Sequence, residues 1–99
     1  MMYPFMTLND NTEITHSEMK PDGRVKVYIE TPDDFGGFHN ATCWLPDYKW
    51  EDIKGYSKDA MCYFRNLIFN NALSIIKASQ KGNMSGISIS STMKRSDPN

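Results

Sequence analysis

The chain has 99 residues, of which 39% are hydrophobic and 12% are aromatic, so it is long enough for one domain with one core and too short for two. Its 11 basic and 12 acidic residues give a formal net charge of −1. That balance gives no overall attraction to nucleic acid or to an anionic membrane, so any such binding has to be local.

The first predicted element is an edge strand over residues 3–8, with Pro4 near its start, where a strand tolerates proline. The next two strands form a hairpin around Pro21-Asp22-Gly23, a run with the composition of a tight turn. Residues 14–19 precede this turn. In the strand after it, apolar and polar residues alternate with the period of a half-buried strand, the apolar ones being Val25, Val27 and Ile29.

A further strand is predicted for residues 38–45, FHNATCWL, which are rich in aromatic and β-favouring residues. The alternation places two sets of side chains on opposite faces, one being Phe38, Asn40, Thr42 and Trp44 and the other His39, Ala41, Cys43 and Leu45. The second set ends in small and apolar residues, so we expect it to face the core. The size of Phe38 and Trp44 favours the opposite orientation.

The orientation of this strand decides whether the sheet has an aromatic surface. If Trp44 faces away from the helix, it joins Phe38 and Tyr28 on the open side of the sheet. Such a surface can stack a base, a sugar or a side chain of a partner. The alternative is that these rings pack on one another across the strands and beneath the loop of residues 32–37.

The segment that follows, residues 46–55, has the sequence PDYKWEDIKG. This run is interpreted as a turn or a short helical segment. We expect Gly55 to end the segment, and Trp50 and Ile53 to pack inward from it.

A long helix is predicted for residues 58–81. Ser57 is a favourable N-cap, and Gly82 stands where a helix needs a left-handed residue in order to end. The composition then becomes serine-rich, so we expect residues 83–99 to form a flexible tail. The predicted fold class is α+β, an antiparallel β-meander of three to four strands packed by one long C-terminal helix, in a single domain over residues 1–82.

The predicted helix has more apolar surface than one side of a sheet needs. At 100° per residue, one broad face should pack on the sheet, and it consists of Ala60, Met61, Phe64, Leu67, Ile68, Ala72, Ile75 and Ala78. More than about 90° away lies a second apolar stripe, made of Cys62, Phe69, Leu73 and Ile76. We interpret this stripe as the interface of a homodimer centred on Phe69 and Leu73. The alternative is that the tail or the N-terminal strand folds over it.

Charge divides unevenly along the chain. Residues 1–55 hold five basic and ten acidic residues, whereas residues 56–82 hold four basic and one acidic. The acidic sheet side is then free for a protein partner. An alternative function is that of an antitoxin-like regulator that contacts nucleic acid through the helix cations Lys58, Arg65, Lys77 and Lys81. A solvated helix face explains the same distribution, and the chain has no glycine-rich phosphate loop or zinc-finger spacing.

His39 and Cys43 are the only His/Cys pair at short spacing. On a strand, residues four apart stand roughly 13 Å apart, which is too far to bind one zinc ion. A small enzyme that uses Cys43 with His39 or His16 is a third possible function. It requires a nucleophile, a base and an orienting group at one place, and no spacing in the sequence indicates this. We therefore predict no catalytic residue, no metal site and no cofactor.

The compartment is predicted from what the chain lacks. No stretch approaches the roughly 18 apolar residues of a membrane span, and the start MMYPFMTLND lacks the features of a signal peptide. We expect a cytoplasmic protein without membrane contact. In that reducing compartment Cys43 and Cys62 behave as small apolar residues, and no disulfide is expected between them.

Residues 2–82 resemble a family of short hypothetical proteins from gut bacteria. The resemblance is clearest in YPFMTLNDNTEITHSE and FHNATCWLPDYKWE. That family has no assigned activity, so the resemblance implies a small bacterial cytoplasmic protein and carries over no catalytic residue. The segment after Gly82 departs from the ending of that family. A looser likeness, in topology alone, is to small bacterial antitoxin-type domains, and topology does not establish function.

Overall fold

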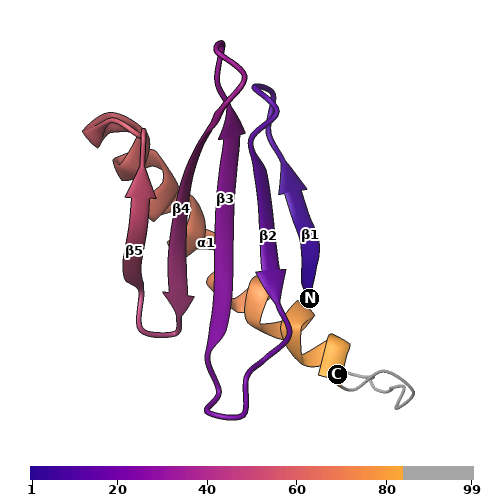
Figure 1. The fold of residues 1–99 in the computed structure, drawn as a ribbon. Helices are drawn as coiled ribbons and strands as arrows, with labels where there is room; N and C mark the ends of the chain where they lie inside the picture. Colours follow the sequence, from indigo (N-terminus) through magenta and orange to yellow (C-terminus); the bar gives the residue numbers. More distant parts are fainter. Residues whose placement is uncertain (84–99) are drawn as a thin grey trace.

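Five strands and one helix make up the described part of the chain (Figure 1). The computed structural model describes the backbone of residues 1–83 and the side chains of residues 1–80. In chain order the elements are β1 (Met2–Thr7), β2 (Glu13–Ser17), β3 (Val25–Pro32), β4 (Phe38–Leu45), β5 (Lys49–Lys54) and α1 (Lys58–Asn83). Each strand pairs antiparallel with the next, in the order β1-β2-β3-β4-β5. The predicted α+β meander with one C-terminal helix is confirmed, with five strands rather than three or four.

The hairpin of β2 and β3 turns at the predicted residues. Gly23 has φ 86°, a left-handed conformation that glycine adopts without a steric penalty, and its N–H donates to the Lys20 carbonyl at 2.9 Å. Asp22 Oδ1 accepts the Arg24 N–H at 3.0 Å. The aspartate therefore closes the turn through its own side chain, as the turn composition indicates.

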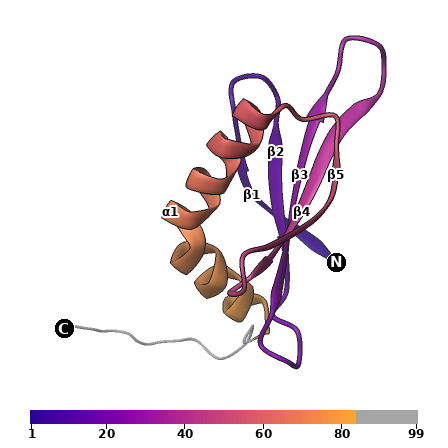
Figure 2. The same ribbon diagram turned by 90° about the vertical axis from the view of Figure 1, so that its left-hand side faces the viewer.

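The core lies between α1 and one face of the sheet (Figure 2). The inward side chains of β3 and β4 are fully buried, namely Val25, Val27, Ile29, Ala41, Cys43 and Leu45. The expected face of α1 packs on them through Met61, Phe64, Ile68, Ala72 and Ile75. The orientation predicted for residues 38–45 is therefore confirmed. Trp44 and Phe38 lie on the opposite, open face of the sheet, which none of the described helices or strands covers.

Residues 46–55 contain a strand, so the prediction of a turn or short helical segment there is wrong. β5 runs antiparallel to β4, with Lys49 opposite Trp44 and Trp50 opposite Cys43. Without β5, the outer backbone N–H and C=O groups of β4 would lack partners in the sheet. Pairing with the neighbouring strand therefore takes precedence over the local helical preference.

The backbone around β5 is also incompatible with a helix. Tyr48 has φ 56° and Asp52 has φ 54°, both in the left-handed region. Trp50 packs partly buried against the core, as expected, but Ile53 is 43% exposed. The expectation that both pack inward rests on helical spacing, which places residues three apart on one side, whereas β5 is an edge strand in which side chains alternate between the faces and the register shifts at this point. The inward packing expected of Ile53 is therefore wrong.

α1 begins where the sequence predicts. Ser57 Oγ accepts the Ala60 N–H at 3.1 Å, which is the bond of an N-cap. The helix continues to Asn83, beyond the predicted end at residue 81, so Gly82 lies in its last turn instead of following it. Glycine inside a helix costs roughly 1 kcal/mol relative to alanine, which weakens the helix without ending it.

Candidate functional site

The second apolar stripe of α1 is largely exposed. Phe69 is 66% exposed and Leu73 is 75% exposed, and the two lie one turn apart. Cys62 is exposed as well. Ile76, the fourth predicted member, is half-buried and packs against the core. Three of the four predicted interface residues are therefore available to a partner.

Tyr48 in the turn between β4 and β5 extends this surface. Its ring lies 5.5 Å from the Phe69 ring, and its side chain is 39% exposed. We refer to Tyr48, Cys62, Phe69 and Leu73 as the helix patch. Sequence reasoning missed Tyr48 because its place beside α1 depends on β5, which the local pattern does not predict.

The described residues leave the helix patch uncovered. β1, the N-terminal strand considered as a cover, is instead the edge strand of the sheet and pairs with β2. Its apolar residues Phe5 and Met6 pack partly buried against the core. The predicted tail, considered as the other cover, lies outside the described residues from residue 84 onward.

The helix cations do not gather at one site. Lys58, Arg65 and Lys77 are exposed, and none forms an ion pair within the described part of the chain. Lys58 and Arg65 lie along the same side of the helix, whereas Lys77 lies about 120° around the axis from Arg65. The side chain of Lys81 is outside the described residues. Nucleic-acid contact through these residues stays a prediction.

Tyr28, Phe38 and Trp44 share the open face of the sheet but lie in separate rows of it. The residues opposite Tyr28, Phe38 and Trp44 across β3 and β4 are Thr42, Pro32 and Lys26, respectively. Trp44 Nε1 donates to Glu51 Oε2 at 3.1 Å, and the Arg24 guanidinium lies 4.5 Å from the centre of the Trp44 ring. The three rings therefore do not face one another directly across the strands.

The histidines lie apart from the thiol that a small enzyme would use. His16 and Cys43 share a row on the core side of the sheet with Val27 between them, so roughly 10 Å separates their strands. His39 lies on β4 with Cys43, roughly 13 Å along the strand. Burial raises the pKa of the Cys43 thiol to about 12, which keeps it protonated and therefore a poor nucleophile. The structure does not bring this thiol and either imidazole together.

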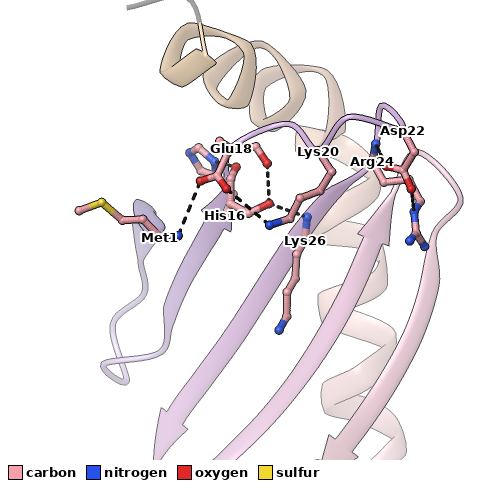
Figure 3. A network of polar contacts seen from close by, with 8 residues as sticks. Met1, His16, Glu18, Lys20, Asp22, Arg24 and Lys26 are labelled. Atoms are coloured by element: carbon pink, nitrogen blue, oxygen red, sulfur yellow. Dashed lines mark hydrogen bonds and ion pairs between the residues drawn. The ribbon is translucent and has the colours of Figure 1, made fainter.

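His16 belongs instead to a polar network that joins β2 to its neighbours (Figure 3). Its Nδ1 lies 2.8 Å from the Ser17 carbonyl, and its ring lies 5.7 Å from the Tyr3 ring of β1. Ser17 Oγ donates to the Glu18 carbonyl at 2.8 Å and accepts the Lys26 N–H of β3 at 3.0 Å. These contacts link three strands, which is a structural role.

Both cysteines are free, Cys43 in the core and Cys62 on the surface. The described part of the chain contains no group of three or more His, Cys, Asp or Glu side chains that could hold a metal ion. Within the same residues, no helix combines the length and the apolar character needed to cross a membrane.

A small cavity lies at the N-terminal end of α1, and sequence reasoning missed it. Its volume is about 320 Å³, and its lining includes Asp10, Thr31, His39, Tyr56, Ser57 and Phe64. These residues come from the β1–β2 turn, β3, β4, the connection after β5, and α1. Because five separate parts of the chain supply the lining, no motif in the sequence indicates it.

Comparisons of the chain with models of protein families, with curated proteins and with solved structures find no match. The resemblance to short proteins of gut bacteria stays a prediction.

Proposed function

We propose that the chain is a non-catalytic interaction module that forms a homodimer through the helix patch. The observation that carries the proposal is the exposure of Phe69 (66%) and Leu73 (75%) next to Tyr48. Large apolar side chains gathered on the surface of a small domain are typical of contact surfaces. The proposal includes the location predicted from the sequence, the bacterial cytoplasm.

The spacing of the stripe favours a second helix as the occupant. Cys62, Phe69 and Ile76 recur every seven residues, and Leu73 lies four residues after Phe69. This is the average period of 3.5 residues with which two helices pair side by side. In an antiparallel pair centred on residue 71, Phe69 of one copy lies opposite Leu73 of the other, so a two-fold axis makes the surface complementary to itself.

The charges beside the stripe do not oppose this pairing. Arg65 and Lys77 flank it on opposite sides, at the angular positions given by 100° per residue. In the antiparallel pair the two copies of Arg65 lie about 18 Å apart along the axis, as do the two copies of Lys77. Arg65 of one copy is level with Lys77 of the other, but the two lie on opposite sides of the stripe. Screening at physiological salt acts over about 8 Å, so little repulsion remains. The other exposed neighbours, Asn66 and Asn70, are uncharged.

The mass in solution tests the proposal. Size-exclusion chromatography with light scattering should give about twice the chain mass of 11.4 kDa for the intact chain. The double variant Phe69→Asp, Leu73→Asp should give 11.4 kDa, because it places charges at the centre of the interface. Circular dichroism should show the variant folded, since both side chains point away from the core.

A matched control keeps this experiment specific to the helix patch. The double variant Phe35→Asp, Ile53→Asp makes the same chemical change at residues that are 96% and 43% exposed, in the β3–β4 loop and in β5. This control should remain a dimer. A mass of 11.4 kDa for the intact chain at high concentration, or equal dissociation of the control, would show that the proposal is wrong.

A further inference from the structure

The cavity at the N-terminal end of α1 joins an aromatic wall to a carboxylate. Tyr56 is the central ring of the wall, 5.5 Å from the His39 ring and 4.9 Å from the Phe64 ring, both in edge-to-face geometry. Asp10, from the turn between β1 and β2, lines the same cavity. The lining described by the structure contains no Lys or Arg.

The hydroxyl of Tyr56 is committed to the protein. It donates to the His39 carbonyl at 3.3 Å and lies 2.7 Å from Thr31 Oγ1. Thr31 Oγ1 in turn lies 2.5 Å from Thr12 Oγ1. This chain of hydrogen-bonded hydroxyls holds the ring in place. Because its phenol oxygen is already bonded to the protein, Tyr56 offers a ligand its aromatic surface.

Asp10 is the one acidic side chain in the described lining of the cavity. Hydrogen bonds from the Thr12 side chain and backbone lower the pKa of Asp10, so its carboxyl is ionised at neutral pH. Burial raises the pKa of Tyr56, the Thr31 hydrogen bond lowers it, and the charges of Asp10 and Glu30 raise it further.

The N-terminal end of α1 carries a partial positive charge, which two groups offset. Ser57 Oγ accepts one free N–H of the first turn, that of Ala60, and Asp59 places a carboxylate in the same turn. Lys58 is exposed and does not line the cavity. No ammonium or guanidinium group of the described lining therefore opposes the charge of Asp10.

We propose that this cavity binds a small organic cation, either a protonated amine or a quaternary ammonium group. The ammonium group lies between Asp10 and the aromatic wall, with its N-alkyl carbons packed against His39, Tyr56 and Phe64. Aromatic rings attract cations through their quadrupole, and a carboxylate adds Coulomb attraction. The volume of about 320 Å³ suits a small ligand. The cavity lies at the end of α1 and the helix patch lies near its middle, so this proposal does not rest on the homodimer.

Choline chloride is a suitable probe, and its neutral isostere 3,3-dimethylbutan-1-ol has the same shape without the charge. In a titration followed by amide chemical shifts, with sodium chloride holding the ionic strength constant, choline should cause saturable shifts at residues around Asp10, Gly55 and Tyr56. The alcohol should bind at least about tenfold more weakly, because its affinity lacks the electrostatic contribution.

Asp10→Asn tests the role of the carboxylate directly. The variant removes the charge and keeps an Oδ1 that can accept the Thr12 N–H, a bond of 3.1 Å in the intact chain, so the turn should persist. The affinity for choline should fall at least about tenfold. Asp47→Asn, at an exposed carboxylate between β4 and β5, is the matched control and should bind choline as the intact chain does.

Three results would overturn the proposal. The first is an Asp10→Asn variant that binds choline as tightly as the intact chain. The second is equal affinity for choline and for the neutral alcohol, which would indicate an apolar site without charge selection. The third is the absence of any saturable shift at about 50 mM choline, which would mean that the affinity for choline is too weak for a cation site.

Discussion

At the scale of single residues, the two cysteines lie in opposite environments. Cys43 is fully buried, and burial raises its thiol pKa to about 12, whereas Cys62 is exposed on α1. Because the thiolate is the reactive form, we predict that Ellman's reagent at about pH 8 modifies Cys62 and leaves Cys43 unmodified in the folded Phe69→Asp, Leu73→Asp variant, which leaves the helix patch open.

The same reagent supplies the control for this prediction. In guanidinium chloride both of the 2 cysteines should react, and in a Cys62→Ser variant the folded chain should release no chromophore. Rapid modification of the folded Cys62→Ser variant would show that Cys43 is accessible and that the packing described for β4 does not hold.

At the scale of elements, the start of α1 depends on one hydrogen bond. Ser57→Ala removes the oxygen that accepts the Ala60 N–H, and the side chain is exposed, so no cavity in the core complicates the result. Urea unfolding should show a loss of about 1 kcal/mol in the free energy of unfolding, with an unchanged m-value. Ser57→Asn retains an acceptor and should recover most of the loss. Equal losses in both variants would contradict the capping role.

The elements that the sequence predicts well have strong local signals. β3 alternates strictly between buried and half-buried residues over Val25–Glu30, and α1 has both an N-cap and a clear apolar face. β5 has neither kind of signal. Tyr48 and Asp52 adopt left-handed backbones without being glycine, and the pairing of β5 with β4 decides their conformation. Long-range pairing of this kind is not encoded in a short window of sequence.

The two candidate sites differ in the same way, because one lies mainly within a single element and the other is assembled from distant parts of the chain. The helix patch could be predicted from helical periodicity, apart from Tyr48, because Phe69 and Leu73 belong to one continuous element. The cavity could not be predicted. Asp10, His39 and Tyr56 approach one another only after the strands have paired and α1 has packed on the sheet.

At the scale of the whole molecule, the fold has two layers, and α1 covers only one face of the sheet (Figure 2). If the outer side of α1 pairs with that of a second copy, unfolding releases two chains. A tenfold rise in chain concentration then adds about 1.4 kcal/mol to the free energy of unfolding of the dimer. We therefore predict that the midpoint of thermal unfolding, measured by calorimetry, rises with the concentration of the intact chain.

The double variant Phe69→Asp, Leu73→Asp should unfold at a midpoint that does not depend on concentration, because a monomer unfolds to one chain. Added salt should leave the midpoint of the intact dimer nearly unchanged, since the proposed contact is apolar at its centre and the two copies of Arg65 lie about 18 Å apart. A midpoint that falls steeply with salt would instead indicate that charged groups hold the copies together. The contact would then have to lie elsewhere on the surface than the helix patch.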